Sequence, residues 1–233
     1  MIGPEDILAF WFPVGHAADE EAHRRQFDWW FSGGAGPAVV ESYAPVLAAA
    51  ARGELDAWSG TPRGRLALII VLDQFSRTIH HDTAEAFAQD AKALDLAVDG
   101  LHSGFYDQLA TVWEKLFFAL PLSHSERLIL HERNLSLCEG LAERAPKPLR
   151  RLYRFSAEQA RAHRDVIARF GRHPHRNTVL GRTSTAEERA YLDGGPLQNE
   201  VDTPGTVTQT TMPGNRGLGI LPAPKLAAAS PKL

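Results

Sequence analysis

Cysteine is nearly absent from this chain, since Cys138 is the single one among 233 residues. One cysteine cannot form an internal disulfide, and it excludes zinc sites built from cysteine pairs. Residues 1–6 carry two acids where a secretory signal would need positive charge followed by an apolar run. We therefore expect a cytoplasmic protein.

Long apolar runs and an excess of basic charge are missing as well. The longest run, Leu66 to Leu72, lies between Arg65 and Asp73 and is far shorter than the ~20 residues of a membrane-spanning helix. It predicts a helix buried in a core. The net charge is −3, so no global positive field attracts nucleic acid or anionic lipid. We expect neither nucleic acid nor a membrane as a partner, and any anion site must be local.

The alternation of apolar and polar residues that is typical of strands is scarce, and helical periodicity extends from Pro4 to about Asp193. Caps, glycines and prolines predict about nine helices joined by short connections. They are expected around residues 7–12, 19–31, 38–52, 62–75, 83–100 and 106–119, from Ser123 or Ser125 to 143, around 149–170, and after a capping box from Ser184 to Glu187. Short connections imply antiparallel neighbours, so the predicted fold is an all-α array of helical hairpins.

Beyond Gly194 the composition changes to glycine, proline, threonine and alanine, and no apolar period persists. A segment of this kind buries too little apolar surface to fold by itself. We predict one helical domain over residues 1–193 and a disordered tail over residues 194–233.

The strongest functional signal is the stretch from Arg169 to Arg182, which holds four arginines and two histidines. Guanidinium groups present planar, bidentate donors that match carboxylate or phosphate, and imidazole adds a base that titrates near neutrality. Arginines at a helix end can merely complement exposed carbonyls, which accounts for Arg169 and Arg172 but not for the later ones. The stretch therefore predicts an anion site.

Two other places carry candidate acid–base groups. Asp73 and Arg77 stand four residues apart on one helix face, so they either form a structural ion pair or lie at the floor of a cleft. His124 and Glu126 are expected in the first turn of a helix, where the acid complements the helix dipole and the histidine has no such structural reason. His163 shares a helix face with apolar residues, so it is either a core histidine or faces the arginine-rich stretch.

Motifs for metals and cofactors are missing. The chain has no His-Glu-x-x-His sequence, and Glu20-x-x-His23 lacks the second copy that a di-iron site in a helical bundle needs. There is no glycine-rich phosphate loop, and the nearby arginines disfavour a bound cation. We predict neither a metal nor a cofactor.

Four ordered motifs mark the chain: ILAFWF at 7–12, LIIVLDQFSR at 68–77, PLSHSE at 121–126, and RFGRHPHRN at 169–177 with LGRTST at 180–185. In this order they resemble the bacterial domain of unknown function 924 family over about residues 5–193. The resemblance implies an all-helical, tetratricopeptide-like superhelix and brings no activity with it. The family pattern has an aromatic residue where His173 stands and a proline where Ser76 stands.

Our first hypothesis is that the protein binds a small phosphate or carboxylate compound, as a binding protein or as an acid–base enzyme. A base, a carboxylate that orients it and arginines that hold the anion together suit proton transfer. His124 or His175 would take the proton and Asp73 would orient the base. The expected ligand contacts are Gln74, Arg77, Glu126, His163, Arg172, Arg176, Asn177 and Arg182.

Our second hypothesis is a non-catalytic, tetratricopeptide-like module in which the same basic cluster captures an acidic or C-terminal peptide of a partner protein. A third interpretation makes the motifs a buried polar network that fixes the packing of the helices. The sequence predicts neither the identity of the ligand nor the oligomeric state.

Overall fold

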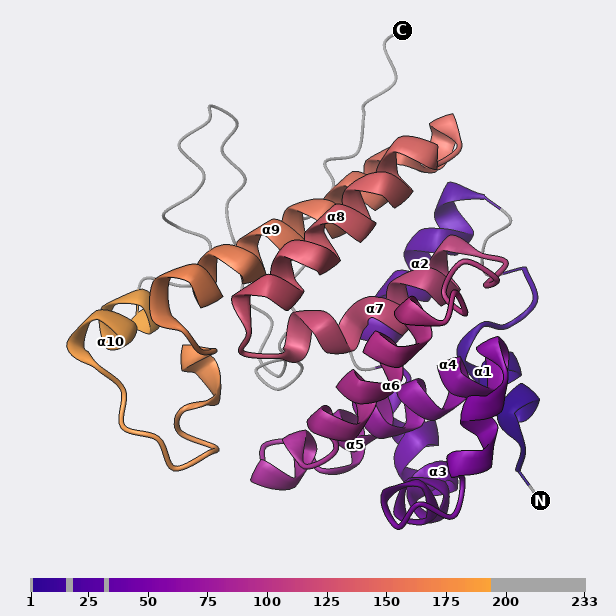
Figure 1. Ribbon diagram of the computed structural model, residues 1–233, viewed down its shortest axis with the longest axis horizontal. Helices are drawn as coiled ribbons and strands as arrows, with labels where there is room; N and C mark the ends of the chain where they lie inside the picture. Colours follow the sequence, from indigo (N-terminus) through magenta and orange to yellow (C-terminus); the bar gives the residue numbers. More distant parts are fainter. Residues whose placement is uncertain (1, 16–18, 32–33, 194–233) are drawn as a thin grey trace, which may run out of the picture.

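The computed structural model describes residues 2–15, 19–31 and 34–193. Figure 1 shows that these residues form helices and connections, and they contain no β-strand, which confirms the predicted all-α fold. The predicted tail, residues 194–233, lies outside the described residues. No helix in the described ranges is long and apolar enough to cross a membrane.

The first half of the fold contains α1 (Pro4–Trp11), α2 (Glu20–Phe31), α3 (Gly36–Ala51), η1 (Asp56–Gly60), α4 (Pro62–Ile69), η2 (Ile70–Phe75), α5 (Ser76–Ile79) and η3 (Ala84–Phe87). The second half contains α6 (Asp90–His102), α7 (Val112–His124), α8 (Leu128–Arg144), η4 (Lys147–Leu149), α9 (Arg150–Phe170), η5 (Pro174–Arg176) and α10 (Ala186–Asp193). Since α4, η2 and α5 run on without a break, the described residues contain nine α-helices, as expected.

The core lies around the continuous helix formed by α4, η2 and α5. Every side chain from Leu66 to Leu72 is buried, as its apolar run predicts. Trp11 from α1 packs on one side of it, with ring centroids 5.6 Å from Phe75 and 5.5 Å from Phe117 of α7. Burial of large aromatic rings of this kind gives a small domain much of its stability.

The element η2 is one turn of π-helix within this buried helix, and it contains Asp73 and Gln74. A π-helical turn is wider than an α-helical turn, is rare in proteins and is frequently found at functional sites. Periodicity alone predicts an unbroken α-helix here, so this local widening is missed from the sequence. Its consequence is that two polar side chains sit inside the core.

The helix α7 continues through Pro121 and ends at His124, so the prediction that it stops before the proline is wrong. A proline inside a helix removes one backbone hydrogen bond and crowds the carbonyl four residues earlier, at a cost of about 3 kcal/mol. Burial of Phe118 and Leu122 on either side of Pro121 offsets it. His124 therefore closes α7 instead of opening the next helix, and Glu126 lies in the connection to α8.

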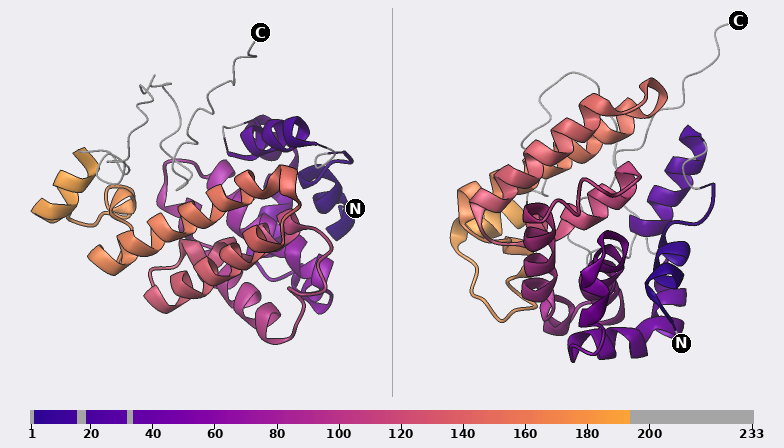
Figure 2. Two further views of the ribbon diagram at one scale, coloured as in Figure 1. Left: turned by 90° about the horizontal axis from the view of Figure 1, so that it is seen from above. Right: turned by 45° about the vertical axis from the view of Figure 1, so that its right-hand side comes forward.

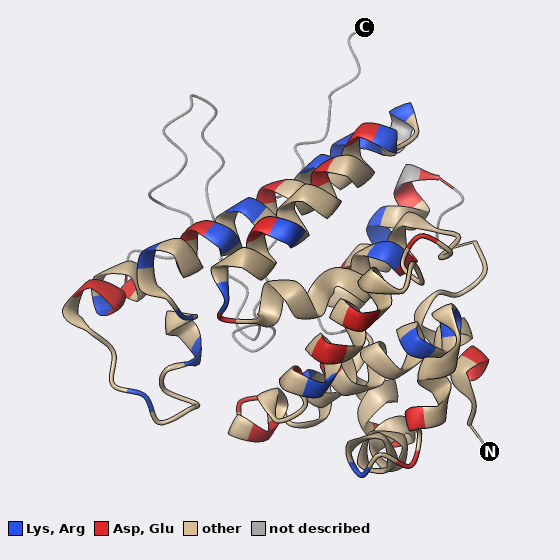
Figure 3. Cartoon of the chain, viewed as in Figure 1, with Lys and Arg blue, Asp and Glu red and all other residues tan. Residues whose placement is uncertain are grey.

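The predicted helical hairpin of α8 and α9 packs side by side along its length, with α10 beyond its far end (Figures 1 and 2). Charged side chains of both signs are interspersed along α8 and α9, whereas α7 carries few (Figure 3). This distribution agrees with an α7 that is covered on most sides and with an α8–α9 hairpin that faces solvent.

The capping box of α10 is formed by Thr185 and Glu188, so its predicted position at Ser184 and Glu187 is wrong by one residue. The Glu188 amide donates to the Thr185 hydroxyl at 3.1 Å, and the Thr185 amide donates to the Glu188 carboxylate at 2.7 Å. Both registers satisfy the sequence pattern. Glu188 is the better choice because its carboxylate also binds Arg172.

Candidate functional site

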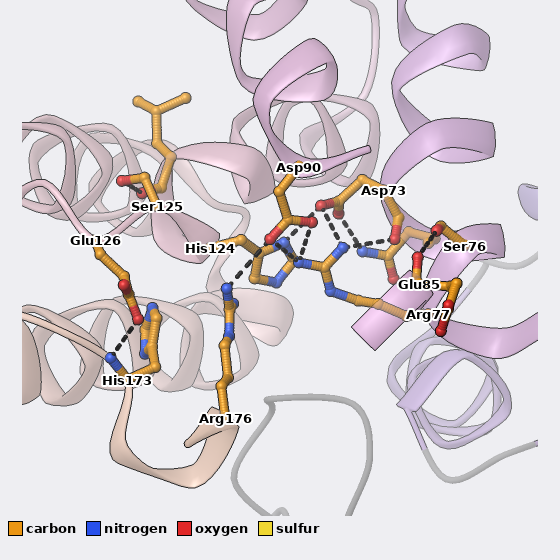
Figure 4. Close-up of polar contacts among 12 residues, drawn as sticks. Asp73, Ser76, Arg77, Glu85, Asp90, His124, Ser125, Glu126, His173 and Arg176 are labelled. Carbon is orange, nitrogen blue, oxygen red and sulfur yellow. Dashed lines mark hydrogen bonds and ion pairs between the residues drawn. The ribbon is translucent and has the colours of Figure 1, made fainter. Parts of the chain in front are cut away.

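Five side chains from five elements meet in a buried group that we call the central network. Its members are Asp73 of η2, Arg77 of α5, Asp90 of α6, His124 of α7 and Arg176 of η5 (Figure 4). Four of them are no more than 5% exposed, and the side chain of Asp90 is 20% exposed. The network thus brings together residues that are up to 103 positions apart in sequence, from Asp73 to Arg176.

Asp73 is the most connected member. One of its oxygens pairs with Arg77 at 2.9 Å and with His124 Nδ1 at 2.7 Å, and the other accepts from Gln74 at 2.6 Å. Burial by itself would raise the pKa of Asp73, but the charge of Arg77 and then His124 outweigh it and hold the pKa below the usual range. Asp73 is therefore ionised at neutral pH.

His124 is neutral and has a defined tautomer. Burial, followed by the positive charge of Arg77, lowers its pKa, and Asp73 only partly opposes them. Because Nδ1 faces a carboxylate, Nδ1 carries the proton and Nε2 keeps its lone pair. Within the described residues Nε2 has no hydrogen-bond partner. This is the arrangement of a histidine that can accept a proton.

Arg176 is buried but only partly bonded. Its Nη1 donates to Asp90 at 3.1 Å, and its guanidinium lies over the ring of Phe87 at 4.7 Å. Its Nε is buried without a hydrogen-bond partner among the residues that the structure describes, and no hydrogen bond from Nη2 accompanies the one that Nη1 donates to Asp90. Burial and the charge of Arg77 lower the pKa of Arg176 to about 10, so it stays cationic at neutral pH. It offers one free bidentate edge, the geometry that suits a carboxylate.

Glu126, in the connection between α7 and α8, binds the arginine-rich stretch through Arg182 and His173. Arg182 binds both of its oxygens, at 2.9 and 2.8 Å, and the backbone amide of His173 donates to it at 2.8 Å. Burial raises the pKa of Glu126, but the hydrogen bonds from Arg182 and His173 reverse this effect and lower it. Glu126 and Arg182 thus neutralise each other.

Three buried histidines and one exposed histidine surround the loop before η5. The His173 ring is 5.7 Å from His131, 6.2 Å from His163 and 5.3 Å from His175, measured between ring centroids. Burial is the main cause that lowers the pKa of His131, His163 and His173, to about 3 for His163. Arg176 lowers the pKa of all three further, so the buried rings are neutral at pH 7.

Comparison with known families gives a match to the bacterial proteins of unknown function DUF924, over residues 7–196. The chain belongs to the DUF924 family. A solved structure of a protein of unknown function from Agrobacterium tumefaciens is 32% identical, with a TM-score of 0.61, and the match covers 82% of this chain and 97% of that one. No curated protein matches the sequence.

In this DUF924 protein, the predicted site residues fall into three groups. Asp73, Gln74, Arg77, His124 and Arg176 meet in or beside the central network. Glu126, Arg182 and the buried His163 lie around His173, and the predicted base His175 is exposed at the edge of that group.

Arg172 and Asn177 form the third group, directed toward α10. Arg172 binds both oxygens of Glu188 at 2.6 and 2.7 Å, and the Asn177 amide donates to Glu188 at 3.3 Å. Their position indicates that they hold α10 against the loop. Unlike Arg176, these two residues therefore do not face the central network, and their contact with a ligand stays a prediction.

Sequence reasoning misses Asp90, Phe87 and His131. Asp90 accepts ion pairs from both Arg77 and Arg176, at 2.9 and 3.1 Å. In the sequence, Asp90 stands in the first turn of a helix, where an acid is common because it interacts favourably with the helix dipole. Its position therefore gives no sign of a further role. His131 stands between the apolar residues 128–130 and the polar residues 132–134 and carries no local signal of its role.

Two surface hollows lie away from the central network. One, of about 470 Å³, is lined by residues of α8 and α9, including Glu139 and Arg161. The other, of about 390 Å³, lies against Leu101, Leu122 and Ile129. A search of the described residues finds no group of three or more histidine, cysteine or acidic side chains that could hold a metal ion. The side chains of the central network are histidine, carboxylate and guanidinium groups.

Proposed function

We propose that this DUF924 protein binds a small acidic compound at the central network and that His124, oriented by Asp73, exchanges a proton with it. The observation that carries the proposal is the Nε–Nη2 edge of Arg176, a residue that is only 5% exposed: its Nε is buried without a partner, and only Nη1 donates a hydrogen bond. Unpaired donors on a buried cation cost more free energy than those of a neutral group, so a bound acceptor there stabilises the folded state.

The Asp73–His124 pair supports catalysis as well as binding. A carboxylate on Nδ1 fixes the imidazole tautomer and stabilises the cation that forms when Nε2 accepts a proton. The π-helical turn that places Asp73 is a second feature typical of functional sites. Arg77 and Arg176 supply fixed positive charge beside the base, where negative charge on a substrate would develop.

Access to the network lies at Asp90 and Arg176, because Asp73, Arg77 and His124 are almost completely covered. The ion pair of Arg176 with Asp90 and its contact with Phe87 are the interactions that a ligand would exchange. Asp90 has the most exposed side chain of the network and therefore marks the entrance. An entering carboxylate would bind the free edge of Arg176 while the side chain swings toward solvent.

The peptide-binding module stays the alternative, since a C-terminal carboxylate would also suit Arg176. A groove for a peptide would need exposed basic residues, and the arginines of the central network are buried. The superhelical arrangement expected from the family resemblance also stays a prediction. A purely structural network is supported by the complete pairing of Arg77, whose partners Asp73 and Asp90 both lie at 2.9 Å.

A thermal-shift screen separates these functions. Phosphorylated and carboxylated metabolites, and a short peptide with a free carboxyl end, would be added to the natural protein, to Arg176→Gln and to the control Arg161→Gln in an exposed pair. We expect an acid to raise the unfolding temperature of the natural protein and of Arg161→Gln but not of Arg176→Gln. Absence of any shift, with Arg176→Gln strongly destabilised, would favour the structural network.

A further inference from the structure

Buried polar atoms without hydrogen-bond partners also lie around His173, which directly precedes η5. They do not belong to the central network. Within the described residues, His173 is 2% exposed and neither of its ring nitrogens has a hydrogen-bond partner. His131 Nδ1 and Arg182 Nε are also buried without partners. Groups of this kind are normally bonded, so several together in one place indicate a missing partner.

These atoms include acceptors as well as donors. The His131 Nε2–H donates to the Ser125 carbonyl at 2.8 Å, which leaves Nδ1 with a lone pair and makes it an acceptor. A neutral His173 offers one donor and one acceptor. The free edge of Arg176 offers donors only. A carboxylate can bind the arginine, but it cannot donate to the imidazoles, so the ligand needs a hydroxyl group as well.

The distances bring the two imidazoles together and place the backbone of Arg176 next to that of His173. The ring centroids of His131 and His173 are 5.7 Å apart, close enough for one oxygen to hydrogen-bond to both rings. The Arg176 amide donates to the His173 carbonyl at 3.1 Å, so the two residues are adjacent. After burial, the charge of Arg176 is the largest cause of the lowered pKa of His173.

The charges around the site favour a single negative charge on the ligand. Each arginine is paired with a carboxylate: Arg77 with Asp73 and Asp90, Arg176 with Asp90, and Arg182 with Glu126. Three cations thus face three anions, and the buried histidines are neutral. A monoanion adds one net negative charge to this balanced set, whereas a phosphate dianion adds two, in a medium where repulsion is strong.

We infer that the ligand is a hydroxycarboxylate, with its carboxylate on Arg176 and its hydroxyl on His131 and His173. This inference rests on the proposed function and narrows its substrate class. The hydroxyl donates to the lone pair of His131 and accepts from the N–H of His173. His163, whose ring centroid is 6.2 Å from that of His173, borders the subsite.

Calorimetric titration with matched acids tests the inference. Lactate and propionate, and gluconate and hexanoate, differ in hydroxyl groups, and inorganic phosphate is the third probe. We expect the hydroxylated acid of at least one pair to bind roughly tenfold more tightly, the effect of one to two hydrogen bonds. The variant His173→Phe keeps a buried ring and is expected to reduce this ratio to about one, whereas His102→Phe, at an exposed position, leaves it unchanged.

The outcomes separate the two proposals. Equal binding of both acids in each pair overturns the hydroxyl subsite but leaves acid binding at Arg176 in place. Stronger binding of phosphate than of any carboxylate overturns the inferred charge of the ligand. If none of the probes binds, the proposed function itself fails. If His173→Phe does not fold, as judged by circular dichroism, the ratios on the natural protein decide alone.

Discussion

Asp73 shows how much one residue can determine in this protein. It is 1% exposed and binds Arg77, His124 and Gln74 at 2.6 to 2.9 Å. The sequence predicts its ion pair with Arg77, because the two stand four positions apart on one helix. It cannot predict the contact with His124, because that contact depends on how α7 packs against η2.

Replacement of Asp73 tests this role. The variant Asp73→Asn keeps the shape but leaves the buried Arg77 without one of its two anions, so we expect it to lose about 3–5 kcal/mol of unfolding free energy. Urea denaturation measures the loss. The control Glu139→Gln removes an exposed pair with Arg161 and is expected to change stability by less than about 0.5 kcal/mol. Similar losses in both variants would show that the burial of Asp73 has no special importance.

The neutral histidines predict a dependence of stability on pH. Their folded-state pKa values are lowered, so the unfolded chain binds protons that the folded chain does not, and stability falls as pH drops below about 6.5. For His163, whose pKa is about 3, the loss between pH 7 and pH 5 is about 2 kcal/mol. Carboxylates change their protonation state mainly below pH 5, so they add little to the loss of stability between pH 7 and pH 5.

Urea midpoints at pH 7, 6 and 5 check the pH dependence. The variant His163→Phe removes one titrating group, so its loss of stability between pH 7 and pH 5 is expected to be about 2 kcal/mol smaller than that of the natural protein. The same profile for both proteins would mean that His163 titrates normally in the folded state.

At the scale of elements, two glycines delimit the loop that carries the arginines and histidines. Gly171 ends α9 with a φ of 68°, and its amide donates to the Ile167 carbonyl at 2.8 Å. Gly181 has a φ of 64°. The sequence predicts the first of these, because glycine after a helix is a common stop signal. The second has no such pattern around it.

Alanine at Gly171 tests this geometry. The left-handed conformation costs an alanine roughly 1 kcal/mol more than a glycine, so Gly171→Ala is expected to be less stable by about that amount. Gly60→Ala is the matched control, because a methyl group there meets nothing within 4 Å and its φ is not positive. The unfolding temperatures of the two variants and of the natural protein measure the difference in stability. An equally stable Gly171→Ala would show that the end of α9 adapts without cost.

The errors of prediction at this scale arise from tertiary contacts. The sequence suggests that Pro121 ends a helix, but the buried residues around it carry α7 one turn further. The capping box of α10 fits two registers, and the tertiary contact of Glu188 with Arg172 selects one. In both cases a long-range contact outweighs a local preference. Helix existence is therefore predictable here, while the last turn of a helix is not.

At the scale of the whole molecule, composition and periodicity predict the all-α fold, its helical hairpins and its buried central helix. They do not predict which side chains meet. Asp90 and Arg176 are 86 positions apart, and their pairing follows only from the packing of α6 against the loop after α9. The candidate site is thus predictable as a set of residue types, and its geometry is not.

Removal of the predicted tail tests the domain boundary. The solved relative from Agrobacterium tumefaciens is covered over 97% of its length by 82% of this chain. We expect a chain that ends at Asp193 to unfold at the same temperature as the full chain, within about 1 °C, and with the same helical circular dichroism. A lower unfolding temperature would assign the residues after 193 to the folded domain.

Side-chain nitrogen spectra of the histidines test the central claim most directly. A proton–nitrogen correlation spectrum at pH 7 would be recorded before and after addition of each acid of the calorimetric panel. The account predicts that His124 is neutral with its proton on Nδ1, and that an acid which binds shifts its Nε2 resonance. A cationic His124, or an Nε2 resonance that does not move while an acid binds elsewhere, would contradict it.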